Sequence, residues 1–203
     1  MLEGMRIIEM ANVISGPFAG MLLADMGADV VKVEMPGRGD PFRGWAGSDD
    51  AIAPSFAAYN RGKRSVGIDL STSEGQAVLY ELAKQCDVFV TNYLPQVRQK
   101  NKFDIEHIRA VNPNIIYARG SAYGDKGPER LVGGFDGTAF WTRSGVGHAL
   151  TPEELGGALP QGIPAFGDSI GGMNIAGGIS AALFHRERTG EAVELGVVAL
   201  DDV

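Results

Sequence analysis

Residues 6–34 read RIIEMANVISGPFAGMLLADMGADVVKVE, and this stretch decides the fold. The apolar run 6–10 predicts a first strand, and the β-branched run 29–34 predicts a second. Between them Pro17 stands at a first-turn position of a helix that Gly27 ends. A strand, a helix and a second strand in this order predict two parallel strands joined by a crossover helix.

The same alternation continues through the rest of the chain. Residues 36–54 are rich in Gly, Pro, Asp and Arg and predict an irregular loop. Further strands are expected at 65–69, 87–91, 114–118 and 192–198, and further helices at 76–86, 104–111, 135–142 and 170–184. We therefore predict an α/β fold with a doubly wound, mostly parallel Rossmann-like sheet and helices on both faces, formed by residues 1–203 as one large domain.

Composition excludes several classes of protein. With 203 residues, 44% hydrophobic and 21% charged, the chain is typical of globular proteins. A net charge of −7 disfavours a broad nucleic-acid surface. The three histidines lie far apart in no zinc-type spacing, and one cysteine cannot form an internal disulfide. We expect no metal site and no nucleic-acid partner.

Two segments bear on localisation. The first fifteen residues contain Glu3 and Glu9 and no basic start, so we expect no signal peptide. The apolar segment 163–184 is long enough to raise the question of a membrane span, but Asp168, Asn174 and several glycines interrupt it. We predict no membrane span and a cytoplasmic protein.

The carboxyl ends of the predicted strands indicate where a ligand binds. In open parallel sheets the ligand lies beyond these ends. Here they carry the loops 12–17, 34–40, 69–71, 92–95 and 119–121. None of these loops contains the glycine pattern of a dinucleotide-binding turn or a P-loop, so the ordinary nicotinamide and ATP signatures are missing.

Asp168 is the one carboxylate in the stretch 162–172, directly before the long apolar helix. It has two interpretations. An aspartate at a helix start commonly caps the helix by accepting a backbone N–H bond. Alternatively, it is a nucleophile or acid/base group in a dry pocket. The local pattern alone favours the cap.

Two other features leave alternatives open. The basic cluster 60–65, NRGKRS, either holds phosphates or is a solvated loop that turns into a strand. The glycine pairs 171–172 and 177–178 weaken a helix, which indicates that something approaches its backbone closely. That partner is either a neighbouring element or a bound ligand.

Taken together, several motifs carry a resemblance to a known family. They are 2–9 (LEGMRIIE), 15–17 (SGP), 27–34 (GADVVKVE), 39–40 (GD), 60–65 (NRGKRS), 167–168 (GD) and 185–190 (HRERTG). In order and spacing they resemble the family III CoA-transferases, which include formyl-CoA transferase and carnitine CoA-transferase, with α-methylacyl-CoA racemase as a relative. Members of that family are longer. The resemblance implies that this chain is the N-terminal half, without the small second domain and the return segment, and that the full-length protein forms an interlocked homodimer.

The resemblance also implies a reaction. Asp168 would attack the thioester of an acyl-CoA and later carry coenzyme A as an aspartyl thioester, from which a carboxylic acid acceptor takes it. The N–H groups at the start of the Asp168 helix would stabilise developing oxyanions. With this added, the nucleophile is preferred over the cap. The substrates are an acyl-CoA and a carboxylic acid, and no cofactor beyond coenzyme A is expected.

Coenzyme A contacts carry over from the family to several strand-end loops. They are Ile14, Ser15, Ile68, Asp69, Leu70, Ser71, Asn92, Tyr93, Leu94 and Lys100. At Met35 some members have an arginine that contacts a phosphate, and Arg38 is the nearby candidate to replace it.

Two alternative functions remain. The first is a racemase or epimerase of 2-methylacyl-CoA esters. That branch has a histidine at the position of Phe135, and phenylalanine cannot transfer a proton, so the sequence favours transfer. His148 is the other histidine considered for that role, although a loop histidine is the simpler interpretation. The second alternative is a non-catalytic fragment that binds coenzyme A.

Overall fold

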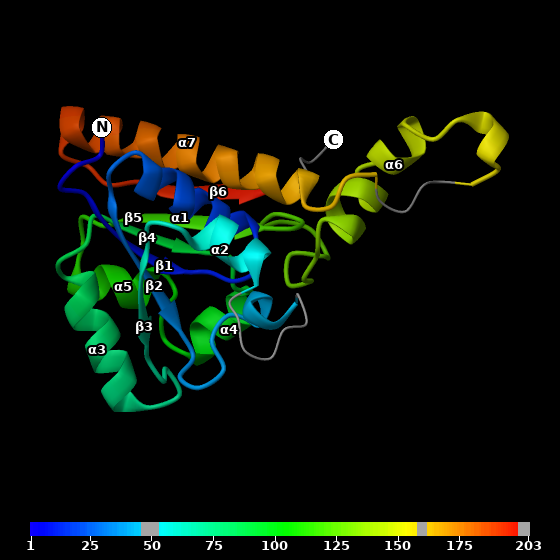
Figure 1. The fold of residues 1–203 in the computed structure, drawn as a ribbon. Helices are drawn as coiled ribbons and strands as arrows, with labels where there is room; N and C mark the ends of the chain where they lie inside the picture. Colours follow the sequence, from blue (N-terminus) through cyan, green and yellow to red (C-terminus); the bar gives the residue numbers. More distant parts are fainter. Residues whose placement is uncertain (46–52, 158–161, 199–203) are drawn as a thin grey trace.

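A single parallel sheet forms the centre of the computed structural model, which describes residues 1–45, 53–157 and 162–198 (Figure 1). Its order is β3-β2-β1-β4-β5-β6, and every pairing is parallel. The strands are β1 (Arg6–Met10), β2 (Asp29–Glu34), β3 (Arg64–Gly67), β4 (Val88–Thr91), β5 (Ile116–Ser121) and β6 (Glu194–Val198). This is the strand order of the dinucleotide-binding doubly wound fold, which reverses direction between β1 and β4. The predicted fold class is confirmed.

Helices cover both faces of the sheet (Figure 1). On one face lie α1 (Ser15–Asp25) and α7 (Phe166–Thr189), and on the other lie α3 (Ser73–Ala83), α4 (Pro95–Lys100) and α5 (Ile105–Val111). Neighbouring strand residues point to opposite faces: Val88 and Val90 pack in the core with α1 and α7, whereas Phe89 packs in the core with α3 and α5. Strands buried on both faces are typical of parallel sheets, which explains their apolar sequences.

Short helices account for most differences from the predicted elements. The helices α2 (Pro54–Asn60) and α4 begin with proline and have 7 and 6 residues, too few to show helical periodicity. The predicted loop 36–54 contains the 3-10 turn η1 (Pro41–Gly44), and its residues 46–52 lie outside the described part of the chain. The helix predicted at 135–142 is a π-helix, η2 (Gly137–Arg143).

One glycine of the pair 171–172 explains how α1 and α7 pack. A Cβ atom on Gly172 would lie 2.8 Å from the backbone oxygen of Ser15 and 2.9 Å from Cβ of Phe18, so glycine allows the two helices to approach. For this residue the neighbouring element is the correct alternative. Gly171 meets only Ser15 Cβ, at 4.0 Å, and Gly177 has nothing within 4 Å. The contact places the first turn of α1 beside the first turns of α7.

A buried ion cluster, which comprises Glu9, Lys32, Glu34, Asp40, Arg43 and Lys63, joins β1, β2 and the loop after β2. Lys32 Nζ lies 2.9 Å from Glu9 Oε1 and 3.0 Å from Asp40 Oδ2. Lys63 Nζ lies 2.7 Å from Glu9 Oε2, and Lys32, Glu9 and Lys63 all have side chains at most 2% exposed. Buried charges are tolerated when they are paired in this way.

The basic cluster 60–65 therefore has a divided role. Lys63 contacts Glu9 inside the protein, so both the phosphate-binding and the solvated-loop interpretations are wrong for this residue. Arg61 and Arg64 are exposed and pair with Asp25 and Asp29, which agrees with the solvated interpretation. None of these three cations is left for a phosphate group.

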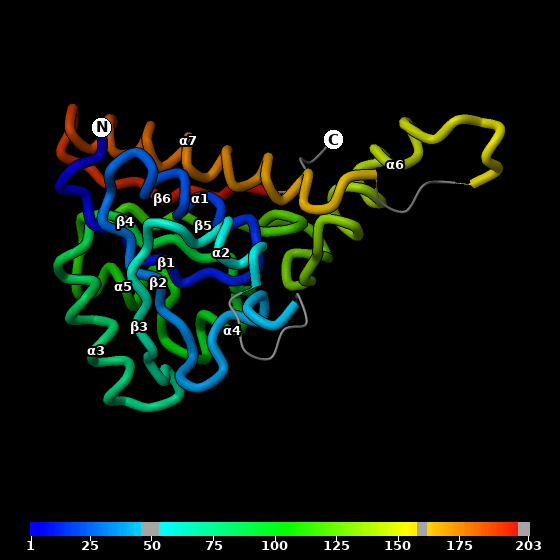
Figure 2. Tube along the Cα trace, in the orientation of Figure 1, coloured from blue at the N-terminus to red at the C-terminus, as the bar shows by residue number. Residues whose placement is uncertain are grey.

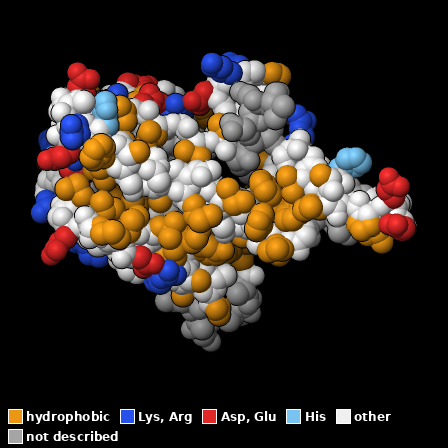
Figure 3. Space-filling view, turned by 90° about the horizontal axis from the view of Figure 1, so that it is seen from above, with side chains coloured by type: hydrophobic (Ala, Val, Ile, Leu, Met, Phe, Trp, Pro, Cys, Tyr) orange, Lys and Arg blue, Asp and Glu red, His pale blue; other side chains and the backbone are white. Residues whose placement is uncertain are grey.

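Two surface features stand out in the views of the whole molecule. The segment that carries α6 (Val146–Ala149) and η3 (Glu153–Leu155) extends away from the sheet (Figure 2). Seen from the α7 side, hydrophobic side chains form a band across the molecule (Figure 3). On α7 itself, Phe166, Met173 and Phe184 are 43%, 50% and 66% exposed. None of the described helices combines the length and apolar character needed to span a bilayer.

Candidate functional site

Two adjoining cavities lie at the carboxyl ends of β1 and β4, where the strand order reverses. Their volumes are about 140 Å³ and about 250 Å³. Residues that line both are Ser15, Asn92, Tyr93, Leu94, Gly134, Phe135 and Asp168. Of the residues expected to contact coenzyme A, Ile14 lines the larger cavity and Ser15, Asn92, Tyr93 and Leu94 line both. The fold thus brings five of the eleven predicted contacts together with Asp168, at the place where doubly wound proteins bind ligands.

Asp168 is the third residue of α7 and does not cap it. The N-cap position belongs to Ala165, whose φ is 61° and which offers no side-chain cap. Within the described residues, no donor bonds to the carboxylate of Asp168. The interpretation of this residue as an N-cap is therefore wrong, and its carboxylate is open to the cavities.

The environment makes the Asp168 carboxylate more basic than an ordinary aspartate. Burial is the larger cause and the negative charge of Asp136 the second, and together they raise the pKa of Asp168 to about 6. At pH 7 the group is still mostly ionised. A partly buried carboxylate with a raised pKa in a cleft is typical of a functional site.

Asp136 is the residue that sequence reasoning missed. It is 7% exposed, and its Oδ1 accepts hydrogen bonds from the backbone N–H groups of Gly167, at 2.7 Å, and of Asp168, at 3.1 Å. Its Oδ2 accepts a bond from Nε1 of Trp141 at 3.2 Å. The expectation that these first N–H groups of α7 stabilise an oxyanion is wrong, because Asp136 already occupies them. The available signal was that Asp136 is the lone carboxylate between residues 130 and 152.

The first turn of α1 offers hydrogen-bond donors that α7 does not. Ser15 begins α1, Ile14 at the N-cap position provides no side-chain cap, and Pro17 has no N–H group. Among the described residues, neither the N–H nor the hydroxyl of Ser15 has a partner. Ser15 lines both cavities with Asp168, so the positive end of α1 borders the same cavities as the carboxylate.

Side chains of the loops after β1 and β4 hold each other in place. Asn92 accepts a bond from the Asn12 N–H at 3.0 Å and donates one to the Asn12 carbonyl at 2.8 Å. The side chain of Asn12 donates to the Tyr93 hydroxyl at 2.5 Å. The predicted ligand contacts Asn92 and Tyr93 therefore line the cavities with side chains that already bond to the protein.

The other predicted contacts with coenzyme A do not line the cavities. Ile68 and Leu70 are 6% and 7% exposed and belong to the core. Asp69 accepts bonds from the N–H and the hydroxyl of Ser71, which lower its pKa, and these two residues form a local turn. The remaining two, Arg38 in the loop after β2 and Lys100 at the end of α4, are exposed, as is Met35 in the same loop as Arg38.

These residues nevertheless share one edge of the sheet with Asp168. β2 lies next to β1 and β3 lies next to β2, and because all strands are parallel, the loops after β2 and β3 leave the sheet at the same edge. At about 4.8 Å per strand, β4 and β3 lie about 14 Å apart. A long flexible ligand that starts at the cavities can reach the loop after β3 along this edge.

Three arginines line the smaller cavity, and they differ in their partners. Arg98 lies 3.0 Å from Asp104, and Arg119 lies 2.8 Å from Asp125 and 2.6 Å from Glu194. Arg130 has no partner within the described part of the chain. One guanidinium at the cavity therefore remains for a negatively charged ligand.

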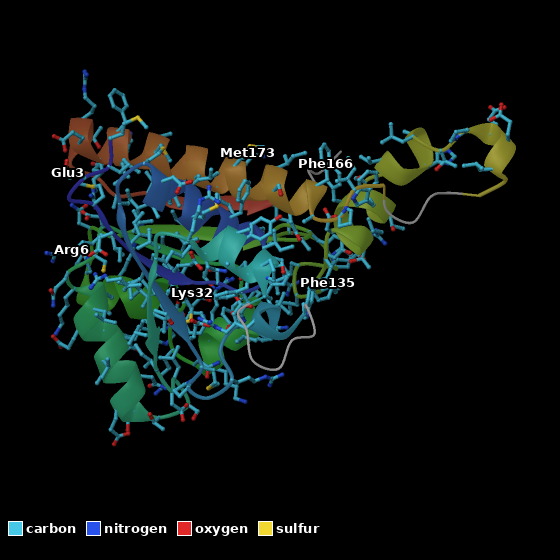
Figure 4. All side chains as sticks on the ribbon, viewed as in Figure 1. Glu3, Arg6, Lys32, Phe135, Phe166 and Met173 are labelled. Carbon is cyan, nitrogen blue, oxygen red and sulfur yellow. The ribbon has the colours of Figure 1, made fainter. Side chains whose placement is uncertain are left out.

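The aromatic residue at the position considered for a racemase histidine also belongs to the cavities. Phe135 lines both and is 63% exposed (Figure 4). His148 lies on α6 and lines neither cavity. No cluster of three His, Cys, Asp or Glu suited to a metal ion occurs in residues 1–45, 53–157 and 162–198. The cavities are thus lined by the Asp168 carboxylate, whose pKa is raised, by the hydrogen-bond donors of Ser15 and by the apolar side chain of Phe135.

Comparison with known proteins identifies the family of this chain. Residues 2–203 match the sequence profile described as CoA-transferase family III. A cinnamoyl-CoA:phenyllactate CoA-transferase of Clostridium sporogenes is 34% identical over 97% of this chain and 48% of its own length. A succinate–glutarate CoA-transferase of Agrobacterium fabrum is 37% identical over 98% of this chain and 51% of its own length. The chain thus spans about half the length of these curated relatives.

Solved structures agree with these sequence matches. A CAIB/BAIF family protein of Brucella suis is 34% identical, with a TM-score of 0.89, over 98% of this chain and 53% of that protein. Rv3272 of Mycobacterium tuberculosis is 35% identical, with a TM-score of 0.85, over the same shares. Both structures match over nearly the whole of this chain and about half of their own length. On this evidence the chain belongs to CoA-transferase family III.

Proposed function

We propose that this chain carries the catalytic aspartate and the coenzyme A site of an acyl-CoA:carboxylate CoA-transferase. The observation that carries the proposal is the carboxylate of Asp168, which has a pKa of about 6 and faces both cavities with no protein donor described on it. A structural aspartate at a helix start would be occupied by backbone N–H groups. Membership of the family and the names of the relatives support the reaction class.

The proposed reaction is a double exchange at one carboxylate. Asp168 attacks the carbonyl carbon of the donor thioester, which releases the CoA thiolate and leaves a mixed anhydride. The thiolate attacks the Asp168 carbonyl, which forms an aspartyl-CoA thioester and releases the donor acid. The acceptor carboxylate attacks that thioester, and the released thiolate then attacks the acceptor carbonyl. The new acyl-CoA leaves and the Asp168 carboxylate is restored, so no atom or electron is left over.

The residues around Asp168 fit the charges that develop in these steps. Each attack places negative charge on a carbonyl oxygen beside the Asp168 carboxylate. The N–H and hydroxyl of Ser15 at the positive end of α1 are positioned to donate to such an oxygen. Arg130 supplies a cation for a substrate carboxylate, and Phe135 offers an apolar surface to the acyl chain. Phenylalanine cannot transfer a proton, which counts against the racemase alternative.

Coenzyme A would lie along the carboxyl edge of the sheet. Its thiol end would occupy the cavities lined by Ile14, Ser15, Asn92, Tyr93 and Leu94. The remainder would pass over β2 and β3 to the exposed loops of Arg38, Asp69, Ser71 and Lys100, with Ile68 and Leu70 contributing backbone groups. The parallel strands end in a row along this edge, which supports such a path for coenzyme A. Arg38 would replace the arginine that some relatives have at the position of Met35.

We also propose that the full-length protein adds a small second domain and works as an interlocked homodimer in the cytoplasm. The exposed apolar band on α7, with Phe166, Met173 and Phe184, supports an interface on that face (Figure 3). The length of the relatives, about twice that of this chain, supports a second domain. Size measurement of the full-length protein in solution tests the dimer.

The test of the proposed function is chemical trapping of the aspartyl thioester. The protein is incubated with succinyl-CoA or cinnamoyl-CoA, and its intact mass is measured before and after addition of hydroxylamine. We expect a CoA adduct on the peptide that contains Asp168, and its conversion to a hydroxamate. Asp168→Asn abolishes both products. Asp125→Asn is the matched control, because Asp125 lines the same cavity but is paired with Arg119.

The result also separates the alternatives. Binding of coenzyme A without an adduct, unchanged in Asp168→Asn, supports the non-catalytic fragment. Exchange of the α-hydrogen of a 2-methylacyl-CoA with solvent deuterium, in the absence of any acceptor acid, supports the racemase. An adduct that persists in Asp168→Asn contradicts the proposed nucleophile.

A further inference from the structure

We propose that Asp136 is a positioning residue that sets both the geometry and the basicity of Asp168. The inference rests on the proposed function, in which Asp168 is the nucleophile. Asp136 comes from the turn before η2, 32 positions from Asp168 in sequence, and reaches the first turn of α7 with its side chain. It contacts the backbone of the nucleophile and not the cavities, so it acts through Asp168.

The contacts of Asp136 fix the start of α7. One oxygen accepts the N–H groups of Gly167 and Asp168, and the other accepts the indole N–H of Trp141. Gly167 allows this approach, because a Cβ there would lie 2.7 Å from Asp136 Oδ1 and 2.2 Å from Phe140 Cγ. Three donors on one side chain hold the backbone of Asp168 in a single position.

A neutral cap would have satisfied the same N–H groups. Serine, threonine or asparagine stabilises a helix start about as well as aspartate does. A carboxylate differs from these neutral caps in its negative charge, and that charge acts on Asp168.

The charge of Asp136 acts on Asp168 in two ways. The positive end of a helix normally favours an ionised acid in its first turn, and Asp136 cancels that influence by taking the first N–H groups. Its own negative charge adds to the effect of burial and raises the pKa of Asp168 further. While it remains ionised, a more basic carboxylate is the stronger nucleophile toward a thioester.

The other charged groups near Asp168 do not replace this effect. Those that line a cavity with it are Tyr93, Arg98, Arg119, Asp125 and Arg130. Arg98, Arg119 and Asp125 are engaged in ion pairs, and the Tyr93 hydroxyl accepts a bond from Asn12. Arg130 is a cation, which would favour the ionised acid. Asp136 is thus the charged group that makes Asp168 more basic.

The test is the titration of the Asp168 carboxyl carbon, followed by carbon-13 NMR in the protein and in Asp136→Asn. Asparagine keeps the Oδ1 acceptor and removes the charge. We expect a midpoint at about pH 6 in the unmodified protein and a midpoint about 1 pH unit lower in the variant. The acid limb of kcat/KM for CoA transfer shifts in the same direction.

Trp141→Phe is the matched control. It removes a hydrogen bond to Asp136 but keeps the charge, so the Asp168 midpoint should stay in place. Asp136→Ser, which supplies a neutral helix cap, gives a second variant if asparagine does not fold. An unchanged midpoint in both neutral variants, or an equal shift in Trp141→Phe, overturns the inference.

The titration also separates this inference from the proposed function. It reports on Asp168 without any substrate. A lowered midpoint in Asp136→Asn together with no CoA adduct in the unmodified protein would mean that the coupling exists and the proposed reaction does not. A CoA adduct in the unmodified protein together with an unchanged midpoint in Asp136→Asn would mean that the proposed reaction occurs and the coupling does not exist.

Discussion

The protein contains two groups of buried carboxylates, and they are treated in opposite ways. In the buried ion cluster under α1, Glu9, Glu34 and Asp40 face Lys32, Lys63 and Arg43. At the start of α7, Asp136 and Asp168 lie next to each other, and no described cation is paired with Asp168. The carboxylates of the first group are paired with cations within the protein, whereas the Asp168 carboxylate has no described cation beside it.

The direction of the pKa shifts reflects this difference. Burial alone would raise the pKa of Glu34, but hydrogen bonds from Arg43, Ser65 and the N–H of Asp40 outweigh it and lower the pKa to about 2. At Asp168 burial and Asp136 act together and raise the pKa to about 6. Uncompensated charge is destabilising, so its occurrence beside a cavity marks the place where function and stability conflict.

The largest effect is expected when one cation of the cluster is removed. Lys32→Met leaves Glu9 and Asp40 buried without their shared partner, which should lower the free energy of unfolding by about 3–5 kcal/mol. Urea unfolding at pH 7 measures it. A loss below 1 kcal/mol would mean that the cluster is not compensated in the way described.

A smaller loss of stability is expected when a methyl group is added to α1 at Gly20. A Cβ on Gly20 would lie 1.9 Å from Glu9 Oε2, whose position is set by Lys63. Gly20→Ala should therefore cost about 1–3 kcal/mol despite the better helix propensity of alanine. Gly177→Ala is the matched control in α7, with open space around it, and should be neutral or stabilising by up to about 1 kcal/mol. Equal effects of the two changes in urea unfolding would contradict the contact with Glu9.

The raised pKa of Asp168 predicts that removing its charge increases stability. The folded-state pKa of Asp168, about 6, is above its unfolded value of about 3.9, so the folded state disfavours the ionised form at pH 7. Asp168→Asn should be more stable than the unmodified protein by about 2 kcal/mol at pH 7. The difference should disappear as the pH falls through 6 to below 4. Thermal unfolding at several pH values tests this, and a destabilised variant at pH 7 would be the contrary result.

Glu34 should show the opposite dependence on pH. Its folded-state pKa of about 2 is below the unfolded value of about 4.3, so its contribution is present above pH 4 and is lost as the pH falls toward 2. Glu34→Gln should be less stable than the unmodified protein at pH 7, and the gap should narrow in acid. Acid titration of the two proteins, followed by circular dichroism, measures the gap. A gap that is constant from pH 7 to pH 2 would contradict the lowered pKa.

The smallest effect is expected at a surface ion pair. Arg64 and Asp29 lie 2.5 Å apart, with side chains 68% and 44% exposed. Arg64→Met should change the free energy of unfolding by less than about 1 kcal/mol, and added salt should reduce the change further. Comparison with Lys32→Met in the same assay shows how much more a buried cation contributes to the free energy of unfolding than an exposed one.

Sequence patterns predicted the elements that repeat and are long enough to show a period. The apolar runs of β1, β2 and β4 and the apolar stretch of α7 were all placed within a few residues. Asp168 was singled out because a lone carboxylate in an apolar segment is visible without any structure. The short helices α2 and α4 were missed because six or seven residues after a proline resemble a turn.

Contacts between distant residues could not be predicted in the same way. Lys63 meets Glu9 across more than 50 positions, and Asp136 meets the N–H of Gly167 across 31. Neither pair has a spacing that a helix or strand imposes. The α7 N–H groups were expected to stabilise an oxyanion. That expectation was wrong because their acceptor, Asp136, comes from a distant part of the chain.

By itself the sequence determined the parallel α/β architecture and singled out Asp168, because hydrophobic periodicity and an isolated charge are local properties. The tertiary structure alone decided which charges are neutralised and which are left exposed to a cavity. Packing brings Lys32 and Lys63 to Glu9 but brings Asp136 to Asp168. The energy of a buried charge depends on its neighbours in space, and those neighbours are set by how the helices and loops pack on the sheet.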